Sequence, residues 1–425
     1  MLSINKIYCW LFVFALLIQI PSIHLLKFLD ELLVVFMMCL VFLDVVVNKQ
    51  FKKYNLLWVI TGIMLFYAIY SFTWVSYNTP KAIFQDFIVQ MKPFCYFCVS
   101  FAVVPKFNAQ IRKILKYISI IISCIVFFSV VFGLVKPILF HPAYVGLLSL
   151  LAFCVYLLAS IDEHGKVAKK DVVISLILLT IGLTSTRAKF YGEYVFILYL
   201  LFFYVPGSLK KMKISHIIIA LVSLCLILVV AWNKIDYYFI SGGEVDMAFD
   251  EDLLSSFARP VMYASMFPIL GMHLLFGSGF ASFGTYASST SINYSNLYSV
   301  IGIDNVWGLS RDFDSFICDA YYPSLAQYGL IGLVLFIVLY VWMYKKLSLY
   351  IYITGKVYYL IGLVIIVALL IENIAATSFN QGAGAMCMMI LGYLISNFKK
   401  ITKEQEIEIR KMPYKESGAL EYIKK

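Results

Sequence analysis

The sequence predicts an all-α polytopic membrane protein, and three observations support this fold class. The chain of 425 residues is 62% hydrophobic and has a mean hydropathy of +0.88, which is too high for a soluble globular protein of this length. Apolar runs recur along the chain, and each supplies the roughly 20 residues that a helix needs to cross about 30 Å of hydrocarbon. These runs do not alternate polar with apolar residues as barrel strands do, so helical spans are expected.

About twelve membrane-spanning helices are expected, because the apolar runs are separated by polar segments. They are predicted at residues 7–23, 28–47, 54–75, 83–104, 114–134, 142–160, 171–184, 189–205, 214–232, 323–343, 357–376 and 381–397. Residues 1–398 then form a single integral membrane domain, and residues 399–425 form a tail that is either a short helix or disordered. An even number of spans places both termini on the same side of the membrane.

The placement of lysine and arginine predicts which side this is. Most of the 34 Lys and Arg residues lie in one set of alternating segments that includes the tail, and such an excess marks the cytoplasmic side. Both termini are therefore expected in the cytoplasm. The net charge of +10 would also suit a nucleic-acid-binding protein, but these charges occur in short loops and the tail, as orientation signals do, so no nucleic-acid partner is expected. The opposite set holds Lys27, Lys81, Lys136, Arg187, Lys189, Lys234, Arg259 and Arg311.

Neither disulfides nor a metal site are expected. The nine cysteines lie mostly inside predicted spans, and Cys318 alone falls in the long outward loop. Cys95 and Cys98 have CxxC spacing, but within an apolar run they are interpreted as small hydrophobic residues on one helix face. The acidic strings at 250–252 and 312–314 lack the strand and helix framework of a metal and nucleotide-sugar site. We therefore expect no metal and no cofactor.

Residues 233–322 form the long outward loop. Within it, residues 257–276 are apolar enough to resemble a thirteenth span, but counting them as one would place the basic tail and Lys345-Lys346 outside. Arg259 and Pro260 near the start of this stretch also weaken a transmembrane interpretation. One or two short helices lying at the outer membrane interface are expected instead.

Three outward cations are candidates for binding an anionic group. Arg187 and Lys189 stand in the short turn between the seventh and eighth spans, against the orientation bias, and a guanidinium there can bind two phosphate oxygens. The alternatives are an interfacial anchor or, for Lys189, a pair with Glu193 one turn further on. Arg259 offers a second guanidinium at the level of the lipid headgroups, or is an ordinary interfacial arginine.

The end of the loop, residues 311–323, mixes charged and aromatic residues just before a span. Aromatic faces and polar groups suit sugar rings and their hydroxyls, which makes Arg311, Tyr321 and Tyr322 candidates for substrate binding. Asp319 is a candidate general base, since a positioned carboxylate can take a proton from a sugar hydroxyl. Alternatively, the tyrosines belong to an interfacial belt and the aspartate caps a helix.

Asp86, Lys92, Glu193 and Glu372 are charged residues inside predicted spans. An Asp or Lys at mid-membrane costs about 2.5–3.5 kcal/mol, so each needs a partner or a function. Glu372 lies about one turn from the outer end of its span and could point into an outward cavity as a substrate-binding group. Asp86 and Lys92 are expected to pair with groups on other helices.

Three motifs carry a resemblance to a known family. They are the outward turn Leu183-Thr-Ser-Thr-Arg187, the stretch from Arg259 to Gly277-Ser-Gly279, and the segment from Asp319-Ala-Tyr-Tyr-Pro to Gly329. Together with the helix count and the late large loop, they resemble the O-antigen polymerases and O-antigen ligases of bacterial surface-polysaccharide assembly. The resemblance spans nearly the whole chain.

The resemblance implies a C-type glycosyltransferase fold in the bacterial inner membrane. It implies inverting, metal-independent transfer at the periplasmic face, from an oligosaccharide linked to undecaprenyl diphosphate, with Arg187 and Arg259 holding the diphosphate. Membrane lipids and a chain-length regulator are the further partners it suggests. Asp319 stands where ligases usually carry a histidine, which favours a polymerase and leaves the base open. His273 is the fallback base, unless it is a packed or hydrogen-bonded loop residue.

Three other functions compete with the polymerase. A ligase, which transfers the glycan to the lipid A core, is the nearest. A polysaccharide flippase or other transporter would show two similar halves and polar residues spread along the mid-membrane, whereas here the halves differ and the polar residues gather towards one face. A non-catalytic assembly partner would leave the outward arginines unexplained.

Overall fold

The computed structural model describes residues 3–20, 29–139, 143–163, 165–202, 258–352, 356–399, 401–411 and 423–424. It confirms a mostly helical chain of the membrane-protein class. Within the described ranges, four helical stretches are long and apolar enough to cross a membrane: Phe51–Val75, Pro80–Val103, Ala109–Val131 and Tyr322–Ile351. The predicted span 214–232, Lys234 and the acidic string at 250–252 lie outside the described residues. The count of twelve spans stays a prediction.

Helices occupy every predicted span that the structure describes. The helices are α1 (Ile4–Ile18), α2 (Leu29–Asn48), α3 (Asn55–Tyr70), α4 (Pro80–Val103), α5 (Ala109–Val131), α6 (Val135–Leu139), α7 (Ala143–Ser160), α8 (Lys169–Thr180), α9 (Ala188–Phe202), α13 (Ala258–Met272), α14 (Leu297–Val300), α15 (Gly329–Leu347), α16 (Lys356–Glu372), α17 (Gly382–Ser396) and α18 (Lys403–Lys411). The span predicted at 323–343 starts differently, because the short 3-10 helix η8 (Tyr322–Tyr328) precedes α15 and Gly329 breaks the path with a φ of +61°.

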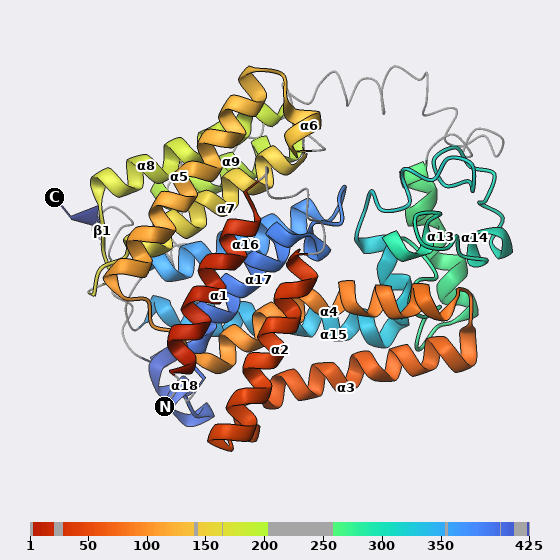
Figure 1. Cartoon of the computed structure of the whole chain (residues 1–425), viewed down its shortest axis with the longest axis horizontal. Helices are drawn as coiled ribbons and strands as arrows, with labels where there is room; N and C mark the ends of the chain where they lie inside the picture. The colour runs from red at the N-terminus through yellow and green to blue at the C-terminus, as the bar shows by residue number, and fades with distance from the viewer. Residues whose placement is uncertain are drawn as a thin grey trace.

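The helices form two groups joined through α16 and α17 (Figure 1). One group contains α2, α3, α4 and α15, and the other contains α5, α7, α8 and α9. Helix α17 is buried along its length and packs closely on α4. A Cβ atom at Gly392 would lie 2.3 Å from the carbonyl oxygen of Phe97, so only glycine allows this approach. Small residues at such contacts are typical of membrane helix packing.

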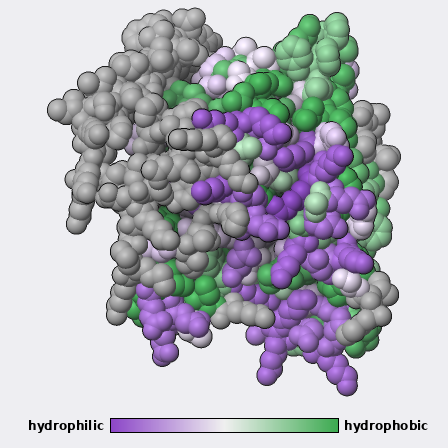
Figure 2. Space-filling view, turned by 90° about the vertical axis from the view of Figure 1, so that its left-hand side faces the viewer, coloured by the Kyte–Doolittle hydropathy of each residue, from purple (hydrophilic) through white to green (hydrophobic). Residues whose placement is uncertain are grey.

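Basic segments that the sequence places on one side of the membrane lie at one end of the bundle. The Lys399 ammonium donates to the carbonyl of Lys53 over 2.8 Å, and Lys346 pairs with Glu406 of α18 over 2.7 Å. Hydrophilic side chains gather over the side of the molecule where α18 and β1 (Val167–Ala168) lie (Figure 2). The assignment of this end to the cytoplasm stays a prediction.

The tail has more structure than the sequence suggests. The predicted short helix is present as α18. Beyond it, β2 (Ile423–Lys424) pairs in parallel with β1, which connects the end of the chain to the segment before α8. The sequence did not lead us to expect this strand pairing.

At the opposite end of the bundle, residues 258–322 fold into a compact cap with a hydrophobic core of its own. The core includes Val261, Met262, Phe283, Leu297 and Tyr298. A short helix is present in the apolar stretch of the loop as α13, which is 15 residues long. Its place at the membrane interface stays a prediction. Its Phe267 side chain is 77% exposed, and Leu274 and Leu275 after it are also exposed, which suits contact with a lipid surface.

The turn between α3 and α4 holds the cap in place. The Asn78 amide donates to the carbonyls of Ala281 (2.7 Å) and Asn293 (2.8 Å), and the Ser71 hydroxyl accepts from the Phe280 N–H over 2.7 Å. The buried Asp86 carboxylate accepts from the Ala281 N–H over 2.6 Å. Asp86 therefore binds the cap backbone, which is one way of satisfying a charged group inside a span.

Candidate functional site

Arg259 and Asp319 form an ion pair at the end of the bundle that carries the cap. They are 60 residues apart in the chain. Arg259 lies in the first turn of α13, where Pro260 is tolerated because the first helical N–H groups have no partner in the helix. Helix α13 packs on η8, which follows Asp319, and this contact brings the two side chains together. Their side chains are 42% and 24% exposed, so both remain accessible.

The stretch that follows Arg259 and the segment that follows Asp319 also meet at their glycines. The Gly279 N–H donates to the Gln327 carbonyl over 2.9 Å. A Cβ at Gly277 would lie 2.3 Å from the carbonyl oxygen of Ala326, and one at Gly329 would lie 2.4 Å from the Gly277 nitrogen. Gly277 also has a φ of +72°, which favours glycine. The glycines therefore permit the close backbone approach predicted for them, and the partner in that approach is the motif that begins at Asp319.

A second ion pair joins Lys189 to Glu372. Glu372 is 1% exposed and also accepts from the Ser378 hydroxyl over 3.3 Å. Lys189 thus pairs across two helices instead of with Glu193 on its own helix. The Glu193 carboxyl is buried, and neither of its oxygens has a hydrogen-bond partner.

The end of α16 links the two ion pairs. The Tyr321 N–H donates to the Asn373 carbonyl (3.0 Å), and the Tyr322 hydroxyl donates to the Leu370 carbonyl (2.6 Å). From α13, the Tyr263 hydroxyl donates to the Ile374 carbonyl over 2.8 Å. The residues around Glu372 are therefore in contact with both the Lys189 side and the Arg259 side of the site.

The remaining predicted site residues have separate surroundings. The Arg187 N–H donates to the Ser185 hydroxyl over 3.3 Å, in the turn that leads into Lys189. The Arg311 guanidinium lies over the ring of Tyr294 in the cap, 5.3 Å from its centroid. Among the described residues, no hydrogen bond or ion pair joins Arg311 to Arg259 or Asp319. Arg311 therefore belongs to the cap rather than to the centre of the site.

The fallback base and the acidic string at 312–314 take structural roles. His273 shares a 2.7 Å hydrogen bond with the Tyr77 hydroxyl, and burial lowers the pKa of its imidazole, so the packed and hydrogen-bonded alternative is confirmed. The Asp314 carboxylate accepts from the N–H and the hydroxyl of Thr290. Among the described residues, no group of three or more His, Cys, Asp or Glu side chains is arranged to hold a metal ion.

The cysteines follow the sequence prediction. The eight that the structure describes are all free, and Cys225 lies outside the described residues. Cys95 and Cys98 are buried in α4 as small hydrophobic residues. Burial also raises the pKa of the Cys318 thiol, which therefore stays protonated beside Asp319.

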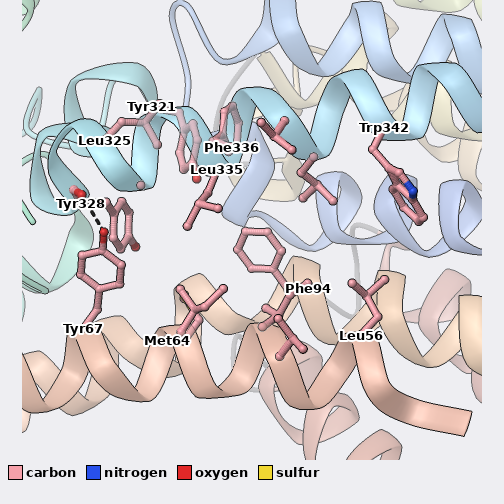
Figure 3. Close-up of a pocket in the computed structure, with 16 residues that line it drawn as sticks. Leu56, Met64, Tyr67, Phe94, Tyr321, Leu325, Tyr328, Leu335, Phe336 and Trp342 are labelled. Carbon is pink, nitrogen blue, oxygen red and sulfur yellow. Dashed lines mark hydrogen bonds between the residues drawn. The ribbon is translucent and has the colours of Figure 1, made fainter. Parts of the chain in front are cut away.

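An apolar groove of about 340 Å³ runs between α3 and α15, and one end of it lies at Tyr321, two residues after Asp319 (Figure 3). Tyr321, Tyr328 and Tyr67 lie at one end of it and Trp342 at the other, and the Tyr67 hydroxyl donates to the Tyr328 carbonyl over 2.8 Å. Val59 and Val338 in its wall are exposed, so the groove opens on the flank of the bundle. Tyr321, expected to contact substrate sugars, instead forms part of the groove wall two residues from Asp319.

Some residues that build the site carry little signal in the sequence. The Tyr263 and Asn78 side chains donate to backbone carbonyls of distant segments, which no local pattern reveals. Asp30 and Glu31 carry a clearer signal, because two acids at the start of an apolar span complement the buried Lys92, with which they pair.

No protein-family model and no curated protein matches the chain. A functional assignment therefore depends on these residues and their geometry.

Proposed function

We propose that this protein is a polymerase of lipid-linked glycans in the bacterial inner membrane. It joins oligosaccharide units carried on undecaprenyl diphosphate at the outer, periplasmic face, as an inverting glycosyltransferase. One observation carries the proposal: Arg259 and Asp319, contributed by two separate motifs, form an ion pair, and an apolar groove that opens on the flank of the bundle has Tyr321, two residues after Asp319, in its wall. A site for a lipid diphosphate needs an apolar surface for the prenyl chain and a cation for the phosphates, side by side.

In the proposed reaction, a hydroxyl oxygen of the acceptor sugar attacks the anomeric carbon of the donor. The bond from that carbon to the diphosphate oxygen breaks, the electron pair leaves with the diphosphate, and the configuration inverts. Asp319 takes the hydroxyl proton. Negative charge grows on the leaving group, so a fixed guanidinium at Arg259 stabilises the transition state more than the ground state, and no metal is required for this effect.

Five of the predicted residues receive roles in this scheme. Arg259, with Arg187 from the other outward turn, holds the diphosphate. Lys189 and Glu372 satisfy each other's charge, so we assign them to holding the Arg187 turn in place. The donor must displace Asp319 from Arg259 when it binds, and this exchange leaves the carboxylate free to accept a proton.

The test compares surface polysaccharide in cells that carry variants of the protein. Arg259→Ala and Asp319→Asn should leave protein levels unchanged and yield a single repeat unit on the lipid core, where the wild type yields long chains. Arg410→Ala in α18, at the opposite end of the bundle, is the control and should retain long chains. Fully polymerised glycan in both site variants would exclude the proposed roles.

Deletion of the protein separates the competing functions. A polymerase deletion leaves core molecules with one repeat unit. A ligase deletion leaves bare core and accumulated lipid-linked polymer, and a flippase deletion leaves lipid-linked single units on the cytoplasmic leaflet. Either of the last two patterns would replace the proposed function.

A further inference from the structure

A second cavity, of about 370 Å³, lies on the opposite face of α4 from the apolar groove. At 100° per residue, Gln85, Val89 and Lys92 in its wall point away from Phe94, which lines the groove. The start of α2, residues 284–287 of the cap, and residues 377–382 before α17 complete the wall. Its volume is within the range of about 300–1,000 Å³ typical of small-molecule sites.

The cavity is more polar than the groove and carries an excess of carboxylates. Lys92 pairs with Asp30 and, over 3.2 Å, with Glu31, which confirms the expectation that it binds groups on another helix. Asp86 is a third carboxylate in the wall. Three carboxylates face one ammonium, so the cavity disfavours an additional anion such as a diphosphate.

Several polar atoms in the wall have unused hydrogen-bonding capacity. Asn380 donates to Gln90 over 2.9 Å, but its buried side-chain oxygen has no partner. The Glu31 side chain is 32% exposed, and a carboxylate accepts more bonds than the one it makes to Lys92. Buried polar atoms without partners are uncommon unless a ligand or water binds there.

We infer that this cavity binds an uncharged or amino-substituted sugar of the acceptor glycan. Carboxylates, an amide and a hydroxyl are the groups that bind sugar hydroxyls, and Tyr144 and Tyr286 supply aromatic faces for the ring. Cys318 lines the cavity, and Asp319, the proposed base, follows it in the chain. The inference rests on the proposed function and gives the two substrates separate sites: Arg259 takes the diphosphate of the donor, and the carboxylate-lined cavity takes the sugar of the acceptor.

The inference is tested by binding measurements on the full-length protein in detergent. The probe is the lipid-free oligosaccharide repeat unit, released by mild acid from the host's own lipid-linked intermediates and titrated by calorimetry. Glu31→Gln and Asn380→Ala should each weaken its binding about tenfold, the effect of losing one hydrogen bond to a charged or buried group. Glu408→Gln, at an exposed position of α18, is the matched control and should bind as the wild type does. Thermal unfolding of each variant verifies that it is folded.

A parallel titration with undecaprenyl diphosphate separates this inference from the proposed function. Arg259→Ala should weaken binding of this lipid, while Glu31→Gln should not. Equal oligosaccharide binding by the wild type and both cavity variants would overturn the inference and leave the proposed function standing. A wild-type protein that binds neither probe would overturn both.

Discussion

At the scale of single residues, the two ion pairs of the site differ in burial, and this determines what each can do. The Arg259–Asp319 pair is partly exposed, and such pairs contribute about 0–1 kcal/mol to stability. Glu372 is almost fully buried against Lys189, and removing one partner of a buried pair costs about 3–5 kcal/mol because the other charge is left uncompensated. The first pair can therefore exchange partners during a reaction, whereas the second is a fixed part of the fold.

This difference gives a prediction for two matched substitutions. Lys189→Ala should lower the free energy of unfolding by about 3–5 kcal/mol, and Arg259→Ala by no more than about 1 kcal/mol. Thermal unfolding of the purified variants in detergent measures both. The double variant Lys189→Ala with Glu372→Gln should recover much of the loss, since no charge remains unpaired. Similar losses for Lys189→Ala and Arg259→Ala would show that the Arg259 pair is also structural.

Which of these residues the sequence could predict depends on how far apart the partners lie. Arg259, Asp319, Lys189 and Glu372 each stand out as charged groups in an apolar setting, so each could be named as a candidate. Their pairing could not be predicted, because Lys189 and Glu372 are 183 positions apart and only tertiary packing brings them together. The alternative that Lys189 pairs with Glu193, its neighbour one helical turn away, was wrong.

At the scale of elements, helices were predictable wherever an apolar run of sufficient length determines them. The structure of the cap was harder to predict from the sequence, because it depends on backbone contacts. Asn78 and Ser71 hold the 280–293 region through hydrogen bonds to main-chain groups, which leave no periodic pattern in the sequence. The glycine motifs indicated that another backbone segment approaches them closely. They did not indicate that Gly277 and Gly329 approach each other.

The glycine contact gives a prediction at this scale. Gly277→Ala should destabilise the docking of the cap by more than about 1 kcal/mol, because a Cβ there would clash with the Ala326 carbonyl and the φ of +72° disfavours alanine. Limited proteolysis of the outer face should then cut the cap faster. Gly271→Ala is the matched control: it lies within α13 with no atom within 4 Å of the new Cβ, and should be neutral or stabilising by up to about 1 kcal/mol. Equal protease resistance in both variants would contradict this account of the contact.

At the scale of the whole molecule, the two ends of the bundle differ in the groups they present. One end gathers Lys53, Lys346 and Lys399 with α18, and the other carries the cap, the tyrosine-lined end of the groove and the carboxylate-lined cavity. This separation agrees with the charge asymmetry from which the orientation was predicted. The proposed function requires the capped end to face outward, because the lipid-linked donor is consumed there.

Orientation is therefore the prediction on which the proposed function most depends. Asn305→Cys in the cap and Glu404→Cys in α18 both place a thiol at an exposed position. In a background where the exposed native Cys39 and Cys124 are replaced by serine, a membrane-impermeant maleimide should label Asn305→Cys in intact spheroplasts. Glu404→Cys should react only after the membrane is permeabilised. The background protein without a new cysteine controls for the remaining native thiols. The opposite labelling pattern would place Arg259 and Asp319 in the cytoplasm, where no periplasmic polymerase could use them.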